Sequence, residues 1–199
     1  MMKVKILGVY GFKNAMIGMR YPKNSEHLSD SMETDIGKED LKLLLKLNRA
    51  GRDHRKALRM IHVQASVFMP ISWWIQYDTY KVATVANSRS RMHKMGSRLL
   101  TEEDFHVGHW TKTMSHVLEE LNKDIIIWQR RSDKAAWRRV IDLLPMSYMQ
   151  ERMVDLNYET LLSILESRYN EKLRGEWRLF CDSFLGSCPC LKELWESLK

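Results

Sequence analysis

Residues 59–77, RMIHVQASVFMPISWWIQY, decide the fold. Apolar side chains alternate with mostly polar ones in the first part of this stretch, at Ile61, Val63, Ala65, Val67 and Met69. A period of two predicts a β-strand over Arg59–Met69 with one buried face. Pro70 then suits the first turn of a helix, and Ile71 and Trp74 follow at helical spacing. The stretch therefore predicts a strand that leads directly into a short helix.

The sequence outside this stretch predicts one further strand and a chain that is mostly helical towards its end. Val4–Val9 favours a short strand, and apolar stripes predict helices over Lys38–Ala50 and Lys112–Arg130. Three later stripes have helical spacing: Trp137, Val140, Ile141 and Leu144; Val154, Tyr158, Leu161, Leu162 and Leu165; and Leu173, Trp177, Phe180 and Phe184. Tyr21–Ile36 and Lys94–Gly108 keep no period and are predicted to be loops.

Composition predicts a single α+β domain over residues 1–199. Hydrophobic residues make up 44% of the chain and charged residues 29%, while 9 glycines and 4 prolines are fewer than all-β architectures carry. No apolar run approaches the roughly 20 residues of a membrane-spanning helix, and the N-terminus lacks the pattern of a secretion signal. Cys188 and Cys190 are too closely spaced for a Cys-x-x-Cys pair. We therefore expect a cytoplasmic protein with ordinary thiols and no membrane partner.

The charge of the chain calls for an anionic partner. Lys and Arg number 32 against 25 Asp and Glu, which gives a formal net charge of +7. Such a surplus suits a nucleotide, a nucleic acid or a membrane surface. The basic residues are dispersed among acidic ones, without the aromatic and basic signature of RNA-recognition sheets, so nucleic acid is not the expected partner. A nucleotide is one of the anionic partners that this charge suits.

Two groups of polar residues could bind such a ligand. The run Asn87-Ser88-Arg89-Ser90-Arg91-Met92-His93-Lys94 combines guanidinium groups with hydroxyls, which a phosphate requires, although a solvated basic loop is the alternative. The second group consists of Leu144-Pro145, Asn157 twelve residues after the proline, and Arg168 eleven residues after the asparagine. This spacing places Asn157 and Arg168 on one face, three helical turns apart.

Histidines and aromatic residues favour packing over a metal or ligand site. His106, His109 and His116 are spaced by three and seven residues, but no cysteine or carboxylate completes a ligand set, so no metal is expected. Most of the 7 Trp and 13 Met fall on the apolar stripes, which favours core packing. Trp73 and Trp74 are the exception, because neighbours on a helix diverge by about 100° and both cannot face the same core.

Taken in order, these segments resemble the flavin-dependent thymidylate synthase family. Val63–Phe68 and Trp73-Trp74 correspond to the strand of that family and its aromatic end. Residues 87–92 resemble the N-E-x-S-x-R-Y part of the signature R-H-R-x-x-S-x-N-E-x-S-x-R-Y. The Leu-Pro turn, Asn157 and Arg168 stand at the spacings of the family. The segment T-Y-K-V-x-T-V-x-N-S, which begins at Thr79, is also similar to phage-encoded proteins.

The resemblance implies an α+β fold with a small antiparallel or mixed sheet and a helical C-terminal half. It also implies a homotetramer that binds dUMP and FAD in clefts between subunits. The residues that it places around the nucleotide are Asn87, Ser88, Arg89, Ser90, Arg91, Arg168 and Gln76. Asn157 and His54 are the residues assigned to the flavin.

Two departures from the family bear on the reaction. Residues 75–78 follow the tryptophan pair without the R-H-R triplet, and Glu159 stands where the family has an arginine, so that it would repel a flavin phosphate. We therefore expect a phage-type nucleotide-binding protein that does not methylate dUMP by the flavin route. One alternative is an active synthase or uridylate-modifying enzyme that uses Gln76, Tyr77 and His93 instead. Another is a viral protein that sequesters a nucleotide signal of host defence.

Overall fold

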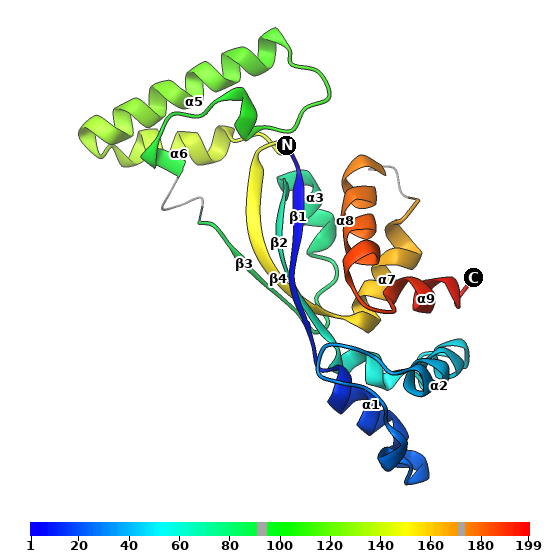
Figure 1. Cartoon of the computed structure of the whole chain (residues 1–199). Helices are drawn as coiled ribbons and strands as arrows, with labels where there is room; N and C mark the ends of the chain where they lie inside the picture. Colours follow the sequence, from blue (N-terminus) through cyan, green and yellow to red (C-terminus); the bar gives the residue numbers. More distant parts are fainter. Residues whose placement is uncertain (91–94, 171–173) are drawn as a thin grey trace. The chain divides into compact units, whose positions relative to one another are not determined.

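The structure, a computed structural model, describes residues 1–90, 95–170 and 174–199 (Figure 1). Four strands form one antiparallel sheet in the order β1 (Lys3–Tyr10), β2 (His62–Pro70), β4 (Met149–Asn157) and β3 (Thr84–Ser88). The α-helices are α1 (Phe12–Arg20), α2 (Lys38–Arg49), α3 (Ile71–Tyr77), α5 (Lys112–Arg131), α6 (Lys134–Leu143), α7 (Tyr158–Arg168), α8 (Arg174–Ser187) and α9 (Leu191–Glu196). Short 3-10 turns are η1 (Tyr21–Lys23), η2 (Glu26–Leu28), η3 (Lys56–Met60), η4 (Met95–Ser97) and η5 (Glu102–Asp104). The predicted α+β architecture is confirmed.

The chain forms two compact units. Unit 1 comprises Met1–Met2, Phe68–Tyr77 and Ser88–Arg152. Unit 2 comprises Lys3–Val67, Asp78–Asn87 and Met153–Lys199. Strands β2, β3 and β4 each contribute residues to both units. The single domain over residues 1–199 remains a prediction.

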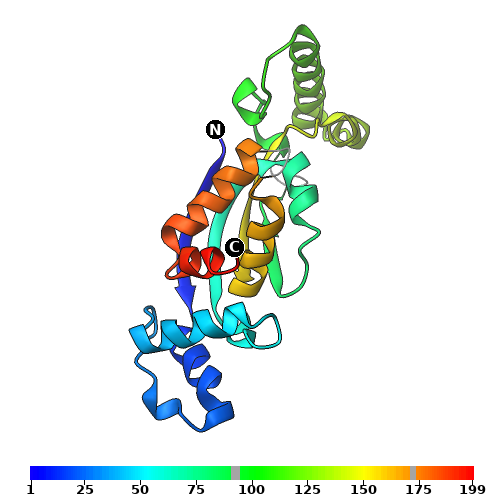
Figure 2. The same ribbon diagram turned by 90° about the vertical axis from the view of Figure 1, so that its right-hand side faces the viewer.

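The core of unit 2 lies between the sheet and the C-terminal helices, where α7, α8 and α9 cover one face of the strands (Figures 1 and 2). Val63, Ala65 and Val67 of β2 are fully buried, whereas Gln64 and Ser66 between them are half-buried. This confirms the period of two. The strand begins later than predicted because Lys56–Met60 forms the turn η3.

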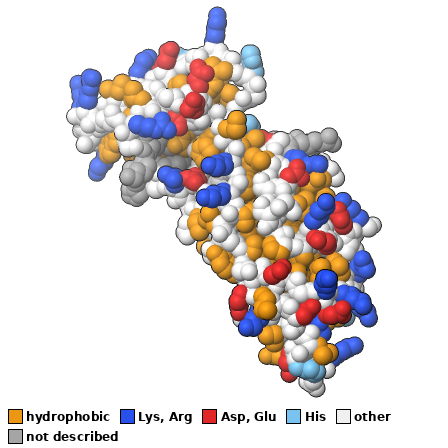
Figure 3. Space-filling view, in the orientation of Figure 1, with side chains coloured by type: hydrophobic (Ala, Val, Ile, Leu, Met, Phe, Trp, Pro, Cys, Tyr) orange, Lys and Arg blue, Asp and Glu red, His pale blue; other side chains and the backbone are white. Residues whose placement is uncertain are grey.

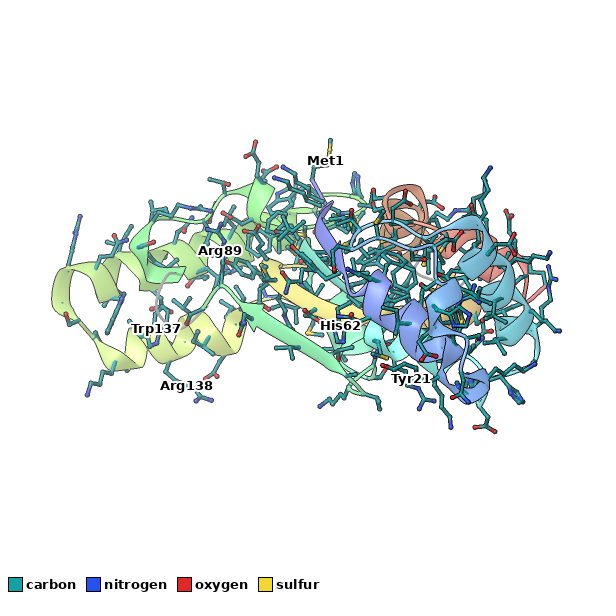
Figure 4. All side chains as sticks on the ribbon, turned by 60° about the horizontal axis from the view of Figure 1, so that its bottom comes forward. Met1, Tyr21, His62, Arg89, Trp137 and Arg138 are labelled. Carbon is teal, nitrogen blue, oxygen red and sulfur yellow. The ribbon has the colours of Figure 1, made fainter. Side chains whose placement is uncertain are left out.

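Unit 1 contains the helix pair α5 and α6. Ser132 adopts a left-handed conformation with φ of 52° between the two helices, and the Asp133 side chain caps α6. Trp137 of α6 packs against Trp128 of α5 with ring centroids 5.4 Å apart, while Arg138 points away from α5 (Figure 4). The helix predicted over Lys112–Arg130 is thereby confirmed, and so is the Trp137 stripe.

The helix predicted from Val154 is wrong at its start. Val154 lies in β4, and α7 begins at Tyr158. Val154, Tyr158 and Leu161 imitate a helical stripe because Val154, a buried residue of the strand, stands four positions before the first residue of the helix. Strand β3 and helices α1 and α9 were not predicted either. Of the stripe assigned to α8, Leu173 lies outside the described residues.

Trp73 and Trp74 are both fully buried within unit 1, so the expectation that they cannot share a core is wrong. Their ring centroids lie 4.9 Å apart in an edge-to-face contact, and Tyr77 stacks on Trp73 at 5.2 Å. Trp74 Nε1 donates to the carbonyls of Met69 at 3.1 Å and Gln150 at 3.0 Å. Rings of this size meet one another although their Cα–Cβ bonds diverge, because each reaches far beyond the helix backbone.

The surface distributes charge broadly. On the face seen in Figure 3, Lys and Arg side chains are interspersed with Asp and Glu. Within the described part of the chain, no helix is both long enough and apolar enough to cross a membrane.

Candidate functional site

Arg168 forms the centre of a cation–aromatic cluster in unit 2. It is the last residue of α7, and its Nε donates to the Tyr80 hydroxyl at 2.8 Å. The guanidinium carbon lies 5.6 Å from the centroid of the Tyr80 ring and 5.4 Å from that of Trp177. Trp177 is fully buried, and its ring is 6.2 Å from that of Tyr80. Two aromatic faces and a neutral hydroxyl therefore hold the cation without cancelling its charge.

Hydrogen bonds from helix α7 hold residues 80–84, the segment that contains Tyr80. Thr84 Oγ1 donates to the Tyr80 carbonyl at 2.5 Å. Thr160 Oγ1, in the first turn of α7, donates to the Val82 carbonyl at 3.2 Å. Because Arg168 contacts the same segment from the last turn, both ends of one helix position residues 80–84. Helix α7 therefore fixes Arg168 together with Tyr80, while Trp177 comes from α8.

The guanidinium of Arg168 is suited to an anion. Over residues 1–90, 95–170 and 174–199, no carboxylate forms an ion pair with it. Arginine presents several N–H donors in one plane, a geometry that matches two oxygens of a phosphate or carboxylate. Arg168 is half-buried, so such a contact would be weakly screened by solvent. This cluster is the candidate anion-binding site of unit 2.

Asn157, assigned to the flavin from the sequence, is the N-cap of α7. Its Oδ1 accepts a hydrogen bond from the Thr160 backbone N–H at 2.9 Å, and only 3% of the residue is exposed. Asparagine is a favoured cap because its side chain satisfies a backbone donor at the start of the helix. Its contact with a cofactor remains a prediction.

Glu159 binds two arginines of the chain. Its carboxylate accepts from Arg55 Nε at 2.9 Å and from Arg55 Nη2 at 3.1 Å, and Arg52 Nε lies 3.9 Å away. Arg55 is 2% exposed and also donates to Asn48 Oδ1 at 3.1 Å. Asn48 in turn donates to the Leu194 carbonyl at 2.8 Å, which connects α2 with α9. The negative charge of Glu159 is thus neutralised internally.

His54 lies outside the Arg168 cluster, in another part of unit 2. It is exposed and lines a cleft of about 460 Å³ that is formed by residues from α1, η1, α2 and the segment 53–60. Its assignment to a flavin remains a prediction.

Arg89 is engaged by an acidic neighbour within unit 1. Its Nε lies 2.5 Å from Glu151 Oε2, and its backbone N–H donates to the Glu151 carbonyl at 3.0 Å. Gln150 Nε2 donates to the Arg89 carbonyl at 3.2 Å. The Arg89 side chain is 79% exposed, so water screens this ion pair (Figure 4). Arg89 offers less unopposed positive charge than Arg168.

The other predicted nucleotide-binding residues occupy varied environments. Asn87 and Ser88 are exposed at the end of β3, with Asn87 in unit 2 and Ser88 in unit 1. Ser90 is half-buried in unit 1. Gln76 is half-buried in the last turn of α3. Arg91, together with His93, lies outside the described residues.

The site contains partners that sequence reasoning missed. Tyr80 and Trp177 hold Arg168, and Arg55 neutralises Glu159, although none of the three was proposed as a site residue. The only sequence signal for Tyr80 was its place in the segment T-Y-K-V-x-T-V-x-N-S. Arg55 carried no signal because it lies 104 residues from Glu159. Trp177 carried none because it belongs to an apolar stripe, which indicates core packing.

The described residues provide no evident metal centre or reactive thiol. No group of three or more His, Cys, Asp or Glu residues is placed to hold a metal ion in the described part of the chain. The cysteines are free thiols, and burial raises the pKa of each of Cys181, Cys188 and Cys190 to about 12. These thiols are therefore protonated at neutral pH and poorly nucleophilic.

Comparison with solved structures identifies the fold. No protein-family model matches the chain, and no curated protein sequence matches it significantly. Thymidylate synthase X from Helicobacter pylori, solved with FAD and dUMP, has 14% sequence identity and a TM-score of 0.76, with 100% of each chain covered. The UMP/dUMP methylase PolB from Streptomyces cacaoi, bound with 5-Br dUMP, has 15% identity and a TM-score of 0.68, with 99% of this chain and 95% of that chain covered.

A second structure of PolB, bound with 5-Br UMP, has 15% identity and a TM-score of 0.63 over 100% of this chain and 95% of that chain. The chain therefore has the fold of flavin-dependent thymidylate synthases, as its sequence resemblance predicted. Identities of this size establish the fold alone. The function has to be argued from the residues of the site.

Proposed function

We propose that the protein binds a uridylate-type nucleotide whose phosphate contacts Arg168. The observation that supports this most directly is the half-buried guanidinium held by Tyr80 and Trp177 without a described carboxylate partner. A phosphate would complete the arrangement by accepting charge-assisted hydrogen bonds from the arginine fork. The fold likeness to proteins solved with dUMP, 5-Br dUMP and 5-Br UMP supports the pyrimidine class of the ligand.

The second part of the proposal is that the bound nucleotide is not methylated by a flavin route. The R-H-R triplet is absent after Trp74, and Glu159 occupies the position of an arginine of the family. Asn157 Oδ1 is already committed to the Thr160 backbone. These residues do not favour an FAD site, so no chemical step is assigned to a flavin. A protein that binds the nucleotide without this reaction would need Arg168 but not the R-H-R triplet or an arginine at position 159.

The proposal includes a homotetramer with the nucleotide in clefts between subunits, as the family resemblance implies. Light scattering coupled to size-exclusion chromatography should then give a mass of about four chains of 23.6 kDa. A monomer at micromolar concentration would contradict the tetramer but would leave the phosphate contact of Arg168 to be tested separately.

Thermal denaturation with dUMP, UMP and inorganic phosphate tests the binding site. We expect dUMP or UMP to raise the melting temperature of the wild-type protein and of Arg178→Gln, but not that of Arg168→Gln. Arg178 is a matched control because its guanidinium also lies over an aromatic ring, 4.0 Å from the centroid of Tyr169, but it pairs with Asp182 at 3.0 Å. Equal stabilisation of Arg168→Gln by the nucleotide would contradict the proposed contact.

Two measurements on the freshly purified protein test the absence of the reaction. An absorbance spectrum reports bound flavin, and an assay with dUMP, methylenetetrahydrofolate, NADPH and FAD reports formation of dTMP. Flavin retention together with dTMP formation would support the active-synthase alternative. A cyclic or ADP-ribose-type nucleotide released on denaturation would instead support sequestration of a defence signal. Retained dUMP or UMP with no dTMP formation is the expected result.

A further inference from the structure

Unit 2 contains a cleft that shares no lining residue with the Arg168 cluster. Its walls come from the last turn of α1, from η1, from one side of α2 and from residues 53–60. The volume is about 460 Å³, which lies in the range of small-molecule binding sites in proteins. All of its lining residues belong to the continuous part of unit 2 that precedes Phe68. The cleft is therefore a feature of one compact body.

The floor of the cleft is apolar. Leu43 and Leu47 stand one turn apart on α2, and both are only half-buried. Met60, at the end of η3, is 48% exposed and lines the same space with Met19 and Ala57. Aliphatic surface left open in this way gains free energy when an apolar ligand removes it from water. No Phe, Tyr or Trp side chain lines the cleft, and its one imidazole, that of His54, lies at the exposed rim, so a hydrocarbon fits the floor better than a stacked base.

The rim of the cleft is basic. Lys23, Lys56 and His54 are exposed there, and Asp53 is the lining carboxylate. Arg20 also lines the cleft, but its Nε is bound to the buried Asp40 at 2.5 Å and does not add free charge. An apolar floor with a cationic rim is complementary to a molecule with a hydrocarbon body and an anionic head. We propose that this cleft binds a small amphipathic anion of the medium-chain carboxylate class.

Gly18 offers a way to fill the cleft without disturbing the fold. It lies inside α1 and lines the cleft, and a Cβ placed there would come within 3.6 Å of Met60 Sδ, an ordinary van der Waals distance. Leucine is also a better helix former than glycine. Gly18→Leu should therefore fold while its side chain occupies the space of the ligand. Gly186→Leu on α8 is the matched control, because nothing lies within 4 Å of a Cβ at that position.

Calorimetric titration with sodium decanoate below its micelle concentration tests the proposal. We expect saturable binding of one decanoate per chain to the wild type and to Gly186→Leu, and at least about tenfold weaker binding to Gly18→Leu. The double variant Lys23→Gln/Lys56→Gln should bind about fivefold more weakly, whereas Lys42→Gln/Lys46→Gln, on exposed positions of α2 outside the cleft, should bind like the wild type. Melting curves establish that each variant is folded.

Several results would overturn the proposal: unchanged decanoate binding to folded Gly18→Leu, decanol binding as tightly as decanoate, or competition of FAD or dUMP with decanoate. Arg168→Gln separates this proposal from the nucleotide proposal. The melting temperature of this variant should no longer rise with dUMP. The variant should still bind decanoate like the wild type, because Arg168 does not line the cleft.

Discussion

The two ends of helix α7 provide opposite environments for an arginine side chain. At the N-terminal end, Glu159 accepts two hydrogen bonds from Arg55, which is 2% exposed. At the C-terminal end, the half-buried Arg168 meets the rings of Tyr80 and Trp177 and donates to a neutral hydroxyl. The first cation is neutralised within the fold, whereas the second is held in place with its charge unopposed by any described carboxylate.

This difference separates stability from binding along one helix. A buried ion pair is costly to break, because removal of one partner leaves the other charged and desolvated. Replacing an arginine that is supported by aromatic faces should cost the protein little stability. The same replacement would remove the main contact of an anionic ligand. The N-terminal end should therefore dominate the free energy of unfolding, and the C-terminal end should dominate nucleotide affinity.

The largest effect is expected from Glu159→Gln. The amide keeps the shape of the side chain but leaves Arg55 buried without a counterion, so the free energy of unfolding should fall by about 3 kcal/mol. Equilibrium denaturation in urea measures this change. Glu166→Gln is the control on the same helix, because Glu166 is exposed and lies 3.9 Å from Arg52, and it should change the free energy by less than about 0.5 kcal/mol. Equal losses in the two variants would remove the distinction between the ends.

Acidification tests the same rule at Asp40, a buried carboxylate of unit 2 that pairs with Arg20. Burial would raise the pKa of Asp40, but hydrogen bonds from Ser31 and Ser29 and the guanidinium of Arg20 lower it below its ordinary value of 3.8. The unfolded chain therefore binds a proton at higher pH than the folded protein does. Stability from this group is complete at neutral pH and is lost as the pH falls below about 4 towards the folded pKa. The loss should be smaller than that for Glu159→Gln, because protonated Asp40 can still accept hydrogen bonds.

Urea denaturation between pH 6 and pH 3 measures this contribution in the wild type and in Asp40→Asn. The variant should be less stable at pH 6 and should lose less free energy of unfolding on acidification than the wild type. Asp104 and Asp133, whose pKa values are also lowered, remain in both proteins and cancel in the comparison. Identical pH slopes would contradict the role assigned to Asp40.

A smaller effect is expected from Asn157→Ala at the start of α7. The substitution removes the cap on the Thr160 N–H, and the free energy of unfolding should fall by about 1 kcal/mol. Asn157→Asp should restore most of this loss, because aspartate is an equally good cap. If Asn157 acted only towards a cofactor, neither substitution would change the unfolding of the ligand-free protein.

Much of the fold could be predicted because burial recurs with the period of each element. The β2 strand and the helices α2, α5 and α6 have long stripes with one buried face, and the sequence is enough to place them within a few residues. Strand β4 was missed because Asp155 and other polar residues interrupt its apolar positions. Asp155 is tolerated there because it accepts hydrogen bonds from Gln64 at 3.0 Å and pairs with His62 at 2.8 Å, both on the neighbouring strand.

The site could be predicted only in part. The spacing of Asn157 and Arg168 predicted one helical face with the two residues three turns apart, and the structure makes Asn157 the N-cap and Arg168 the last residue of α7. Their partners were inaccessible to spacing arguments, since Tyr80 lies 88 residues from Arg168 and Arg55 lies 104 residues from Glu159. Contacts over such separations depend on how the chain folds back, which no local period encodes. The expectation that Glu159 would repel a phosphate therefore could not take account of Arg55, its partner within the fold.

The smallest effect on stability, and the sharpest test of the comparison, is expected from Arg168→Lys. Lysine keeps the positive charge near Tyr80 and Trp177, so the free energy of unfolding should change by only about 0.5 kcal/mol. It lacks the planar fork of donors, however, and dUMP should bind about tenfold more weakly. Calorimetric titration measures the affinity, and urea denaturation measures the stability of the same sample. A large loss of stability with unchanged dUMP affinity would show that Arg168, like Arg55, serves the fold and not a ligand.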